Sequence, residues 1–188
     1  MPSIKHTLVA LVEDKPGVLN RVASLIRRRN FNIESIAVGH SEQPGLSRMT
    51  IVVDGATTAV EQVRKQLDKL IEVVKVSDIT DDPIVARELA LIKVMANSST
   101  RSEIIQIVDI FRAKIIDVAQ DSLVIEATGD EEKIDSLHSL LRRFGVKELA
   151  RTGRIAMPRG PSGVAKGEPQ QEEAENHSDR PKKASPGQ

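Results

Sequence analysis

The spacing of apolar residues along the chain changes repeatedly between the period of a strand and that of a helix. A mostly apolar run at 6–12 is typical of a buried strand, and the turn-forming segment 13–17 follows it. From Val18 the apolar residues recur three or four positions apart, which predicts a helix whose first turn accommodates Pro16. Later segments complete the order βαββαβ, typical of a ferredoxin-like domain. The expected elements are strands at 6–12, 32–38, 48–53 and 72–77 and helices at 18–29 and 59–70.

The same pattern begins again after the turn-forming segment 81–83. A shift of 82 positions, as from Val22 to Ile104, places apolar residues of the first half on apolar residues of the second. This repetition predicts two copies of one unit, with a chance likeness between two α+β segments as the alternative. The expected elements of the second copy are strands at 89–96, 115–119, 123–127 and 147–150 and helices at 104–111 and 134–141.

We therefore predict an α+β protein of two tandem ferredoxin-like domains, at 4–79 and 84–157, followed by a tail at 158–188. The tail is rich in Pro, Gly, Glu, Gln, Ser and Lys and has hardly any large apolar residue. Such a segment cannot bury enough surface to offset the entropy of ordering, so we expect it to be disordered.

Composition argues against several classes of function. The formal net charge is zero and aromatic residues make up only 2%, which disfavours a nucleic-acid-binding module. The absence of cysteine excludes disulfides, thiolate nucleophiles and cysteine-ligated zinc. We find neither an apolar leader nor an apolar run long enough for a membrane helix, and we expect a cytoplasmic protein.

No motif for catalysis or metal binding stands out. Phosphate-binding loops, dinucleotide fingerprints and paired-histidine zinc motifs are absent from the sequence. The four histidines are widely separated, although His6 and His40 could meet across neighbouring strands. We therefore expect no catalytic residue, no metal site and no cofactor on this chain.

The sharpest local feature is the segment Asp14-Lys15-Pro16-Gly17-Val18 between a buried strand and an amphipathic helix. Unpaired backbone N–H groups at a helix start can receive a carboxylate, and a glycine lets a ligand approach them closely. Asp14 could hold an ammonium group, and the pattern suggests a zwitterion with a short branched side chain. The alternative is that Pro16 and Gly17 simply start the helix while Asp14 caps it. The predicted effector site consists of Val12, Asp14, Pro16, Gly17, Val18, Asn32 and Ile33, with Asn32 expected at the same end of the sheet as Asp14.

The corresponding loop of the second copy has a different sequence. Asn97-Ser98-Ser99-Thr100 stands where the first copy has its Pro-Gly loop. We expect the second loop not to bind the same ligand in the same way.

Three blocks of the first half, 12–19, 31–35 and 46–51, resemble the N-terminal ACT domain of acetolactate (acetohydroxyacid) synthase small subunits. Segments 110–118 and 150–153 are similar to the C-terminal domain of that family, and the resemblance spans roughly 4–160. It implies a regulatory rather than catalytic protein, whose effector pockets form where two ACT domains meet. Some members have Asn where this chain has Asp14, which bears on how the ligand's ammonium group is held.

The resemblance also implies partners. It predicts a large catalytic subunit that carries thiamine diphosphate, magnesium and FAD and condenses two pyruvates. It further predicts a homodimer through the ACT domain and feedback inhibition by valine or another branched-chain amino acid. A stand-alone ACT-type sensor acting on a different enzyme or regulator is the alternative.

Overall fold

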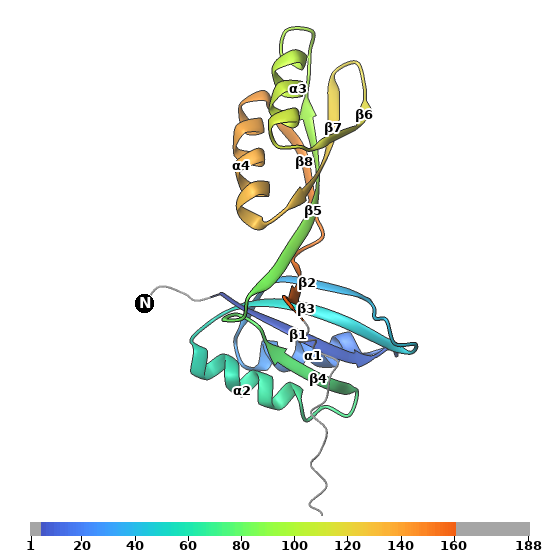
Figure 1. Ribbon diagram of the computed structural model, residues 1–188, viewed down its shortest axis with the longest axis vertical. Helices are drawn as coiled ribbons and strands as arrows, with labels where there is room; N and C mark the ends of the chain where they lie inside the picture. Colours follow the sequence, from blue (N-terminus) through green and yellow to red (C-terminus); the bar gives the residue numbers. More distant parts are fainter. Residues whose placement is uncertain (1–4, 161–188) are drawn as a thin grey trace, which may run out of the picture.

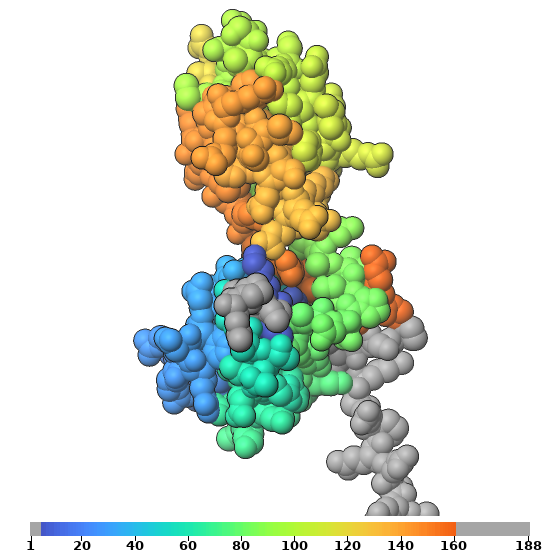
Figure 2. Space-filling model, turned by 90° about the vertical axis from the view of Figure 1, so that its left-hand side faces the viewer, coloured from blue at the N-terminus to red at the C-terminus, as the bar shows by residue number. Residues whose placement is uncertain are grey.

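The chain forms two lobes joined by a narrow waist, as Figures 1 and 2 show for the computed structural model, which describes residues 5–160. Each lobe contains a four-strand antiparallel core sheet with two helices, which confirms the predicted pair of ferredoxin-like α+β domains. The predicted tail lies outside the described residues from 161 onward.

The first domain has the strand order β2-β3-β1-β4. Both of its helices cover the same face of the sheet, because alternate residues of β1, such as Leu8, Ala10 and Val12, are fully buried against their apolar stripes. The other face carries Val9 and Thr50 at its centre. The elements are β1 (Lys5–Glu13), α1 (Val18–Arg28), β2 (Asn32–His40), β3 (Leu46–Asp54), α2 (Thr57–Leu67) and β4 (Val73–Asp78).

The second domain repeats this arrangement with the order β6-β7-β5-β8. Its core contains Ile104 and Ile107 of α3, and the 82-residue shift matches them to Val22 and Leu25 of α1. The elements are β5 (Ile84–Met95), α3 (Arg101–Ile110), β6 (Lys114–Val118), β7 (Ser122–Gly129), α4 (Glu131–Leu141), the 3-10 turn η1 (Arg142–Phe144), β8 (Val146–Arg151) and β9 (Ile155–Pro158).

A two-stranded ribbon connects the lobes and was not predicted. The first four residues of β5, Ile84–Arg87, pair with the short strand β9, so β5 begins five residues before the strand expected at 89. The inward side of this ribbon packs on the helix-free face of the first sheet, where Ala156 joins Val9 and Ile79 in a small buried cluster. Ordered structure also continues past the expected start of the tail, because the backbone N–H of Arg159 donates to the Pro83 carbonyl.

Candidate functional site

The loop after β1 leaves the start of α1 open. Gly17 has φ of 88°, a left-handed conformation that favours glycine, and no heavy atom lies within 4 Å of where a Cβ would stand. No side chain of the described residues caps α1. Backbone hydrogen bonds from Glu13 to Glu72 and from Asp14 to Gly45 hold the loop in place. The Val18 N–H donates to the Lys15 carbonyl at 3.5 Å. The following N–H groups of the first helical turn face an accessible, positively polarised position.

Asp14 stands beside this opening and contacts two other side chains. Its carboxylate accepts a hydrogen bond from the Ser47 hydroxyl at 3.3 Å and lies 3.3 Å from Nδ1 of His40. The carboxylate remains 46% exposed, so it has room for a further cation. These are the residue types of a hydrolase triad, but Ser47 bonds to the aspartate rather than to the histidine. The contacts seen thus give no base to activate the serine.

Ser47 and His40 were missed by the sequence-based site. Both lie at the turn end of the β2–β3 hairpin, where the register pairs them directly with each other. The hairpin was predicted, but its register was not. The sequence therefore contains no indication that this pair lies beside Asp14, apart from the presence of Ser47 in segment 46–51, which resembles the ACT domain.

The apolar members of the predicted site have different roles in the structure. Val12 and Val18 are buried in the core of the first domain, so they support the loop from below. Pro16 is exposed beside Gly17. Ile33 is partly buried and packs against the same core cluster.

Asn32 lies at the opposite end of the sheet from Asp14, contrary to the sequence-based expectation. It pairs with Asp54, which in turn pairs with Lys5 at the start of β1. Helix α1 returns the chain to the starting end of the sheet before β2 begins, and nine strand residues at about 3.3 Å each separate the two ends. His6 and His40 are separated in the same way and do not meet. One chain by itself therefore does not bring the predicted site together.

The equivalent loop of the second domain is closed by its own side chain. The side-chain oxygen Oδ1 of Asn97 accepts hydrogen bonds from the backbone N–H groups of Ser99 and Thr100, at 3.0 Å each, and from the hydroxyls of the same two residues. These amides are already satisfied by a side chain, whereas no side chain of the described residues caps the start of α1. The difference supports the expectation that the two loops do not bind a ligand in the same way.

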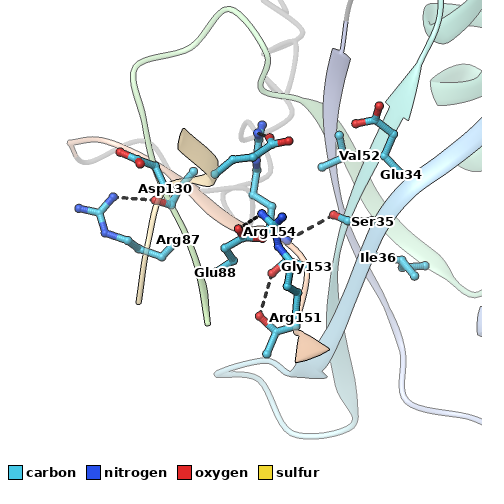
Figure 3. Close-up of a pocket in the computed structure, with 13 residues that line it drawn as sticks. Glu34, Ser35, Ile36, Val52, Arg87, Glu88, Asp130, Arg151, Gly153 and Arg154 are labelled. Atoms are coloured by element: carbon cyan, nitrogen blue, oxygen red, sulfur yellow. Dashed lines mark hydrogen bonds and ion pairs between the residues drawn. The ribbon is translucent and has the colours of Figure 1, made fainter. Parts of the chain in front are cut away.

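Apart from these two loops, a hollow with a volume of about 510 Å³ lies between the lobes. Most of its charges are paired with one another: Glu131 bonds Arg154 at 2.6 Å and Lys5 at 3.0 Å, and Glu88 pairs with Arg151. Figure 3 shows Arg154 reaching toward Ser35 of the first domain, whose hydroxyl accepts from the Arg154 backbone N–H at 3.3 Å. The hydrogen bonds from Lys5 and Arg154 lower the pKa of the Glu131 carboxyl, with Lys5 as the larger cause. This hollow is a polar joint between the lobes.

Among residues 5–160, no cluster of three or more histidine, cysteine or acidic side chains is arranged to hold a metal ion. Within the same range, none of the helices has the length and apolar character needed to cross a membrane.

Comparison with known proteins assigns both halves of the chain. Residues 8–75 match the model described as "AHAS small subunit-like ACT domain", and residues 87–160 match "Small subunit of acetolactate synthase". A probable acetolactate synthase small subunit of Archaeoglobus fulgidus is 59% identical over 157 residues, covering 84% of this chain and 98% of the relative. The acetolactate synthase small subunit of Mycolicibacterium smegmatis is 54% identical over 159 residues, covering 85% and 94%.

A solved structure supports the same assignment. The acetolactate synthase small subunit of Thermotoga maritima has 47% identity and a TM-score of 0.78, over 85% of this chain and 99% of that one. The match thus extends over nearly the whole length of that solved chain. This chain therefore belongs to the acetolactate synthase small-subunit family.

Proposed function

We propose that this chain raises the activity of an acetolactate synthase catalytic subunit and makes that activity sensitive to valine or another branched-chain amino acid. The catalytic subunit would carry thiamine diphosphate, magnesium and FAD and condense two pyruvates. Family membership supports the regulatory role, and the open loop at Gly17 supports the amino-acid effector.

The observation that carries the effector proposal is the pairing of an uncapped helix start with an exposed carboxylate. The N–H groups after Gly17 suit the ligand's carboxylate, and Asp14 suits its ammonium group. Both charged ends of an α-amino acid thus find a partner within one loop. Asp14 already accepts from Ser47, which fixes the orientation of its carboxylate.

A second copy of the chain completes the predicted site. Strand β2 is at the edge of its sheet and spans Asn32–His40. If two β2 strands pair antiparallel about a two-fold axis at Ile36, Asn32 of each copy lies opposite His40 of the other. His40 contacts Asp14, so this dimer brings Asn32 and Ile33 of one copy beside the Gly17 loop of the other.

The start of β3 supplies a route from this loop to the rest of the molecule. Ser47 and Arg48 are neighbours and point to opposite faces of the sheet. Ser47 donates to Asp14, while Arg48 donates to the Ala156 carbonyl of β9 at 3.1 Å. A ligand that repositions the Asp14 loop would thereby act on the ribbon that leads to the second domain. We propose that the second domain contacts the catalytic subunit.

The test is acetolactate formation by the catalytic subunit of the same organism, with and without this chain, across a valine titration. We expect higher activity with the chain and suppression of the added activity by valine. Activation without suppression by valine, leucine or isoleucine would contradict the effector proposal alone. No activation at all would contradict the partner and favour a stand-alone sensor.

A further inference from the structure

An apolar groove with two arginines lies where the ribbon meets the first sheet. It has a volume of about 310 Å³ and runs between the ends of β2 and β3 on one side and β5 and β9 on the other. We name it the ribbon groove and define it by Arg48, Val85, Arg87, Ile155 and Met157, all of which line it. Arg87 also lines the polar joint, and His40, which contacts Asp14, lines one end of the groove.

The outward side of the ribbon exposes three large apolar side chains together. Val85 pairs with Met157, and Arg87 pairs with Ile155, so the three apolar residues share one face. Their exposed fractions are 38% for Val85, 57% for Ile155 and 62% for Met157. Grouped apolar exposure of this kind is typical of a surface that another molecule covers.

The groove also carries the positive charge of two arginines, of which Arg48 interacts electrostatically with Glu42, a residue outside the groove lining. Arg48 is partly buried, and this desolvation lowers the pKa of its guanidinium. Arg48 donates to the Ala156 carbonyl and Arg87 to the Ala86 carbonyl, but neither forms an ion pair with any of the described residues. No aspartate or glutamate lines the groove. The complementary surface therefore combines apolar side chains with a carboxylate.

We propose that the ribbon groove docks the catalytic subunit, through a segment in which an aspartate or glutamate is flanked by apolar side chains. This inference rests on the proposed function and adds the surface that the function uses. A second copy of this chain fits less well, because a symmetric contact would set the arginines of one groove against those of the other. The segment 161–188 also fits less well, because its single large apolar residue is Val164.

The experiment measures activation of the purified catalytic subunit as the full-length chain is titrated. Met157→Asp places a carboxylate on the apolar face, and Arg87→Glu reverses one charge of the groove. Central interface residues commonly cost a factor of ten or more in affinity. We expect each variant to raise the half-saturating concentration at least about tenfold, while Arg87→Lys stays close to wild type.

Matched controls make the same chemical changes elsewhere. Ile71→Asp and Lys69→Glu alter exposed residues of the loop between α2 and β4, outside the groove, and we expect them to stay within about twofold of wild type. Valine binding by calorimetry and the circular dichroism spectrum verify that Met157→Asp and Arg87→Glu fold.

Three results would overturn the inference. In the first, wild type activates and both groove variants keep its half-saturating concentration, which leaves the proposed function intact. In the second, light scattering shows that the groove variants self-associate more weakly than wild type, while the fraction that is still dimeric activates the catalytic subunit normally. The groove would then join two copies of this chain. In the third, a chain ending at Gly160 activates at a tenfold lower concentration than the full chain, so the tail occupies the groove. If wild type itself fails to activate, the proposed function fails and the inference fails with it.

Discussion

Replacing Gly17 with aspartate puts a carboxylate at the open start of α1, where we expect the effector's own carboxylate. The space is free, because no heavy atom lies within 4 Å of the position a Cβ would take. The cost to folding comes from φ of 88°, which for a residue other than glycine is about 1 kcal/mol. Since aspartate is among the residues that tolerate this conformation, the first domain should still fold.

The loss in binding should be larger than this loss in stability. The new carboxylate competes for the N–H groups of the first helical turn and repels the ligand. Hydrogen bonds to a charged group contribute about 1.5–3 kcal/mol, which corresponds to about 10- to 100-fold in affinity. The valine concentration that gives half-maximal inhibition should rise by that factor, while activation of the catalytic subunit is retained.

Gly17→Asn is the matched control, because it has the same shape and the same backbone strain but no charge. Acetolactate formation is measured over a valine titration for wild type and both variants, and calorimetry measures valine binding directly. Urea unfolding verifies that the two variants are equally stable. Inhibition of Gly17→Asp at the wild-type valine concentration would refute the placement of the ligand. Equal losses in both variants would show that the backbone, not the charge, is responsible.

Three further substitutions test other parts of the argument. Asn97→Ala removes the acceptor that closes the second-domain loop and should lower the free energy of unfolding by about 1–2 kcal/mol. The valine titration of acetolactate formation should not change, and a loss of inhibition would show that this loop also takes part in valine binding. Glu131→Gln tests the joint between the lobes. The pKa of Glu131 is depressed in the folded protein, so the stability that its ion pairs contribute is present above the usual pKa of 4.5 and is lost as the pH falls through the lower native value. Below about pH 5 the variant should therefore lose less stability in urea unfolding than wild type, by roughly 0.5 kcal/mol because the pair is partly exposed and screened. The same pH profile for both proteins would show that the ion pair has no net effect. Ile125→Ala opens a cavity in the fully buried core of the second domain and should cost about 2–5 kcal/mol in denaturant unfolding; a cost below 1 kcal/mol would contradict the packing described.

The position of Asn32, far from the Gly17 loop within one chain, follows from the topology of the first domain. In a strand–helix–strand connection the helix returns the chain, so two parallel strands begin at the same end of the sheet. Asn32 therefore had to lie at the end where β1 begins, not at the end where Asp14 follows it. The error came from treating proximity along the chain as proximity at one end of the sheet. A second copy, paired through β2, remains our prediction for how the two groups meet.

The sequence by itself determined the order of the main elements from β1 to β8, their buried faces and the candidate loop at Gly17. These features depend on local periodicity and on the backbone preferences of glycine and proline, which a short segment expresses without the rest of the chain. Only the tertiary structure decided that Ser47 and His40 flank Asp14, that Asn97 closes the second loop, and that β9 folds back to make the ribbon groove. Those features depend on register and on pairing between segments up to about 70 residues apart, such as Val85 with Met157. Short strands like β9 have too few residues for a pattern of their own, so their place is set by the surface they can cover.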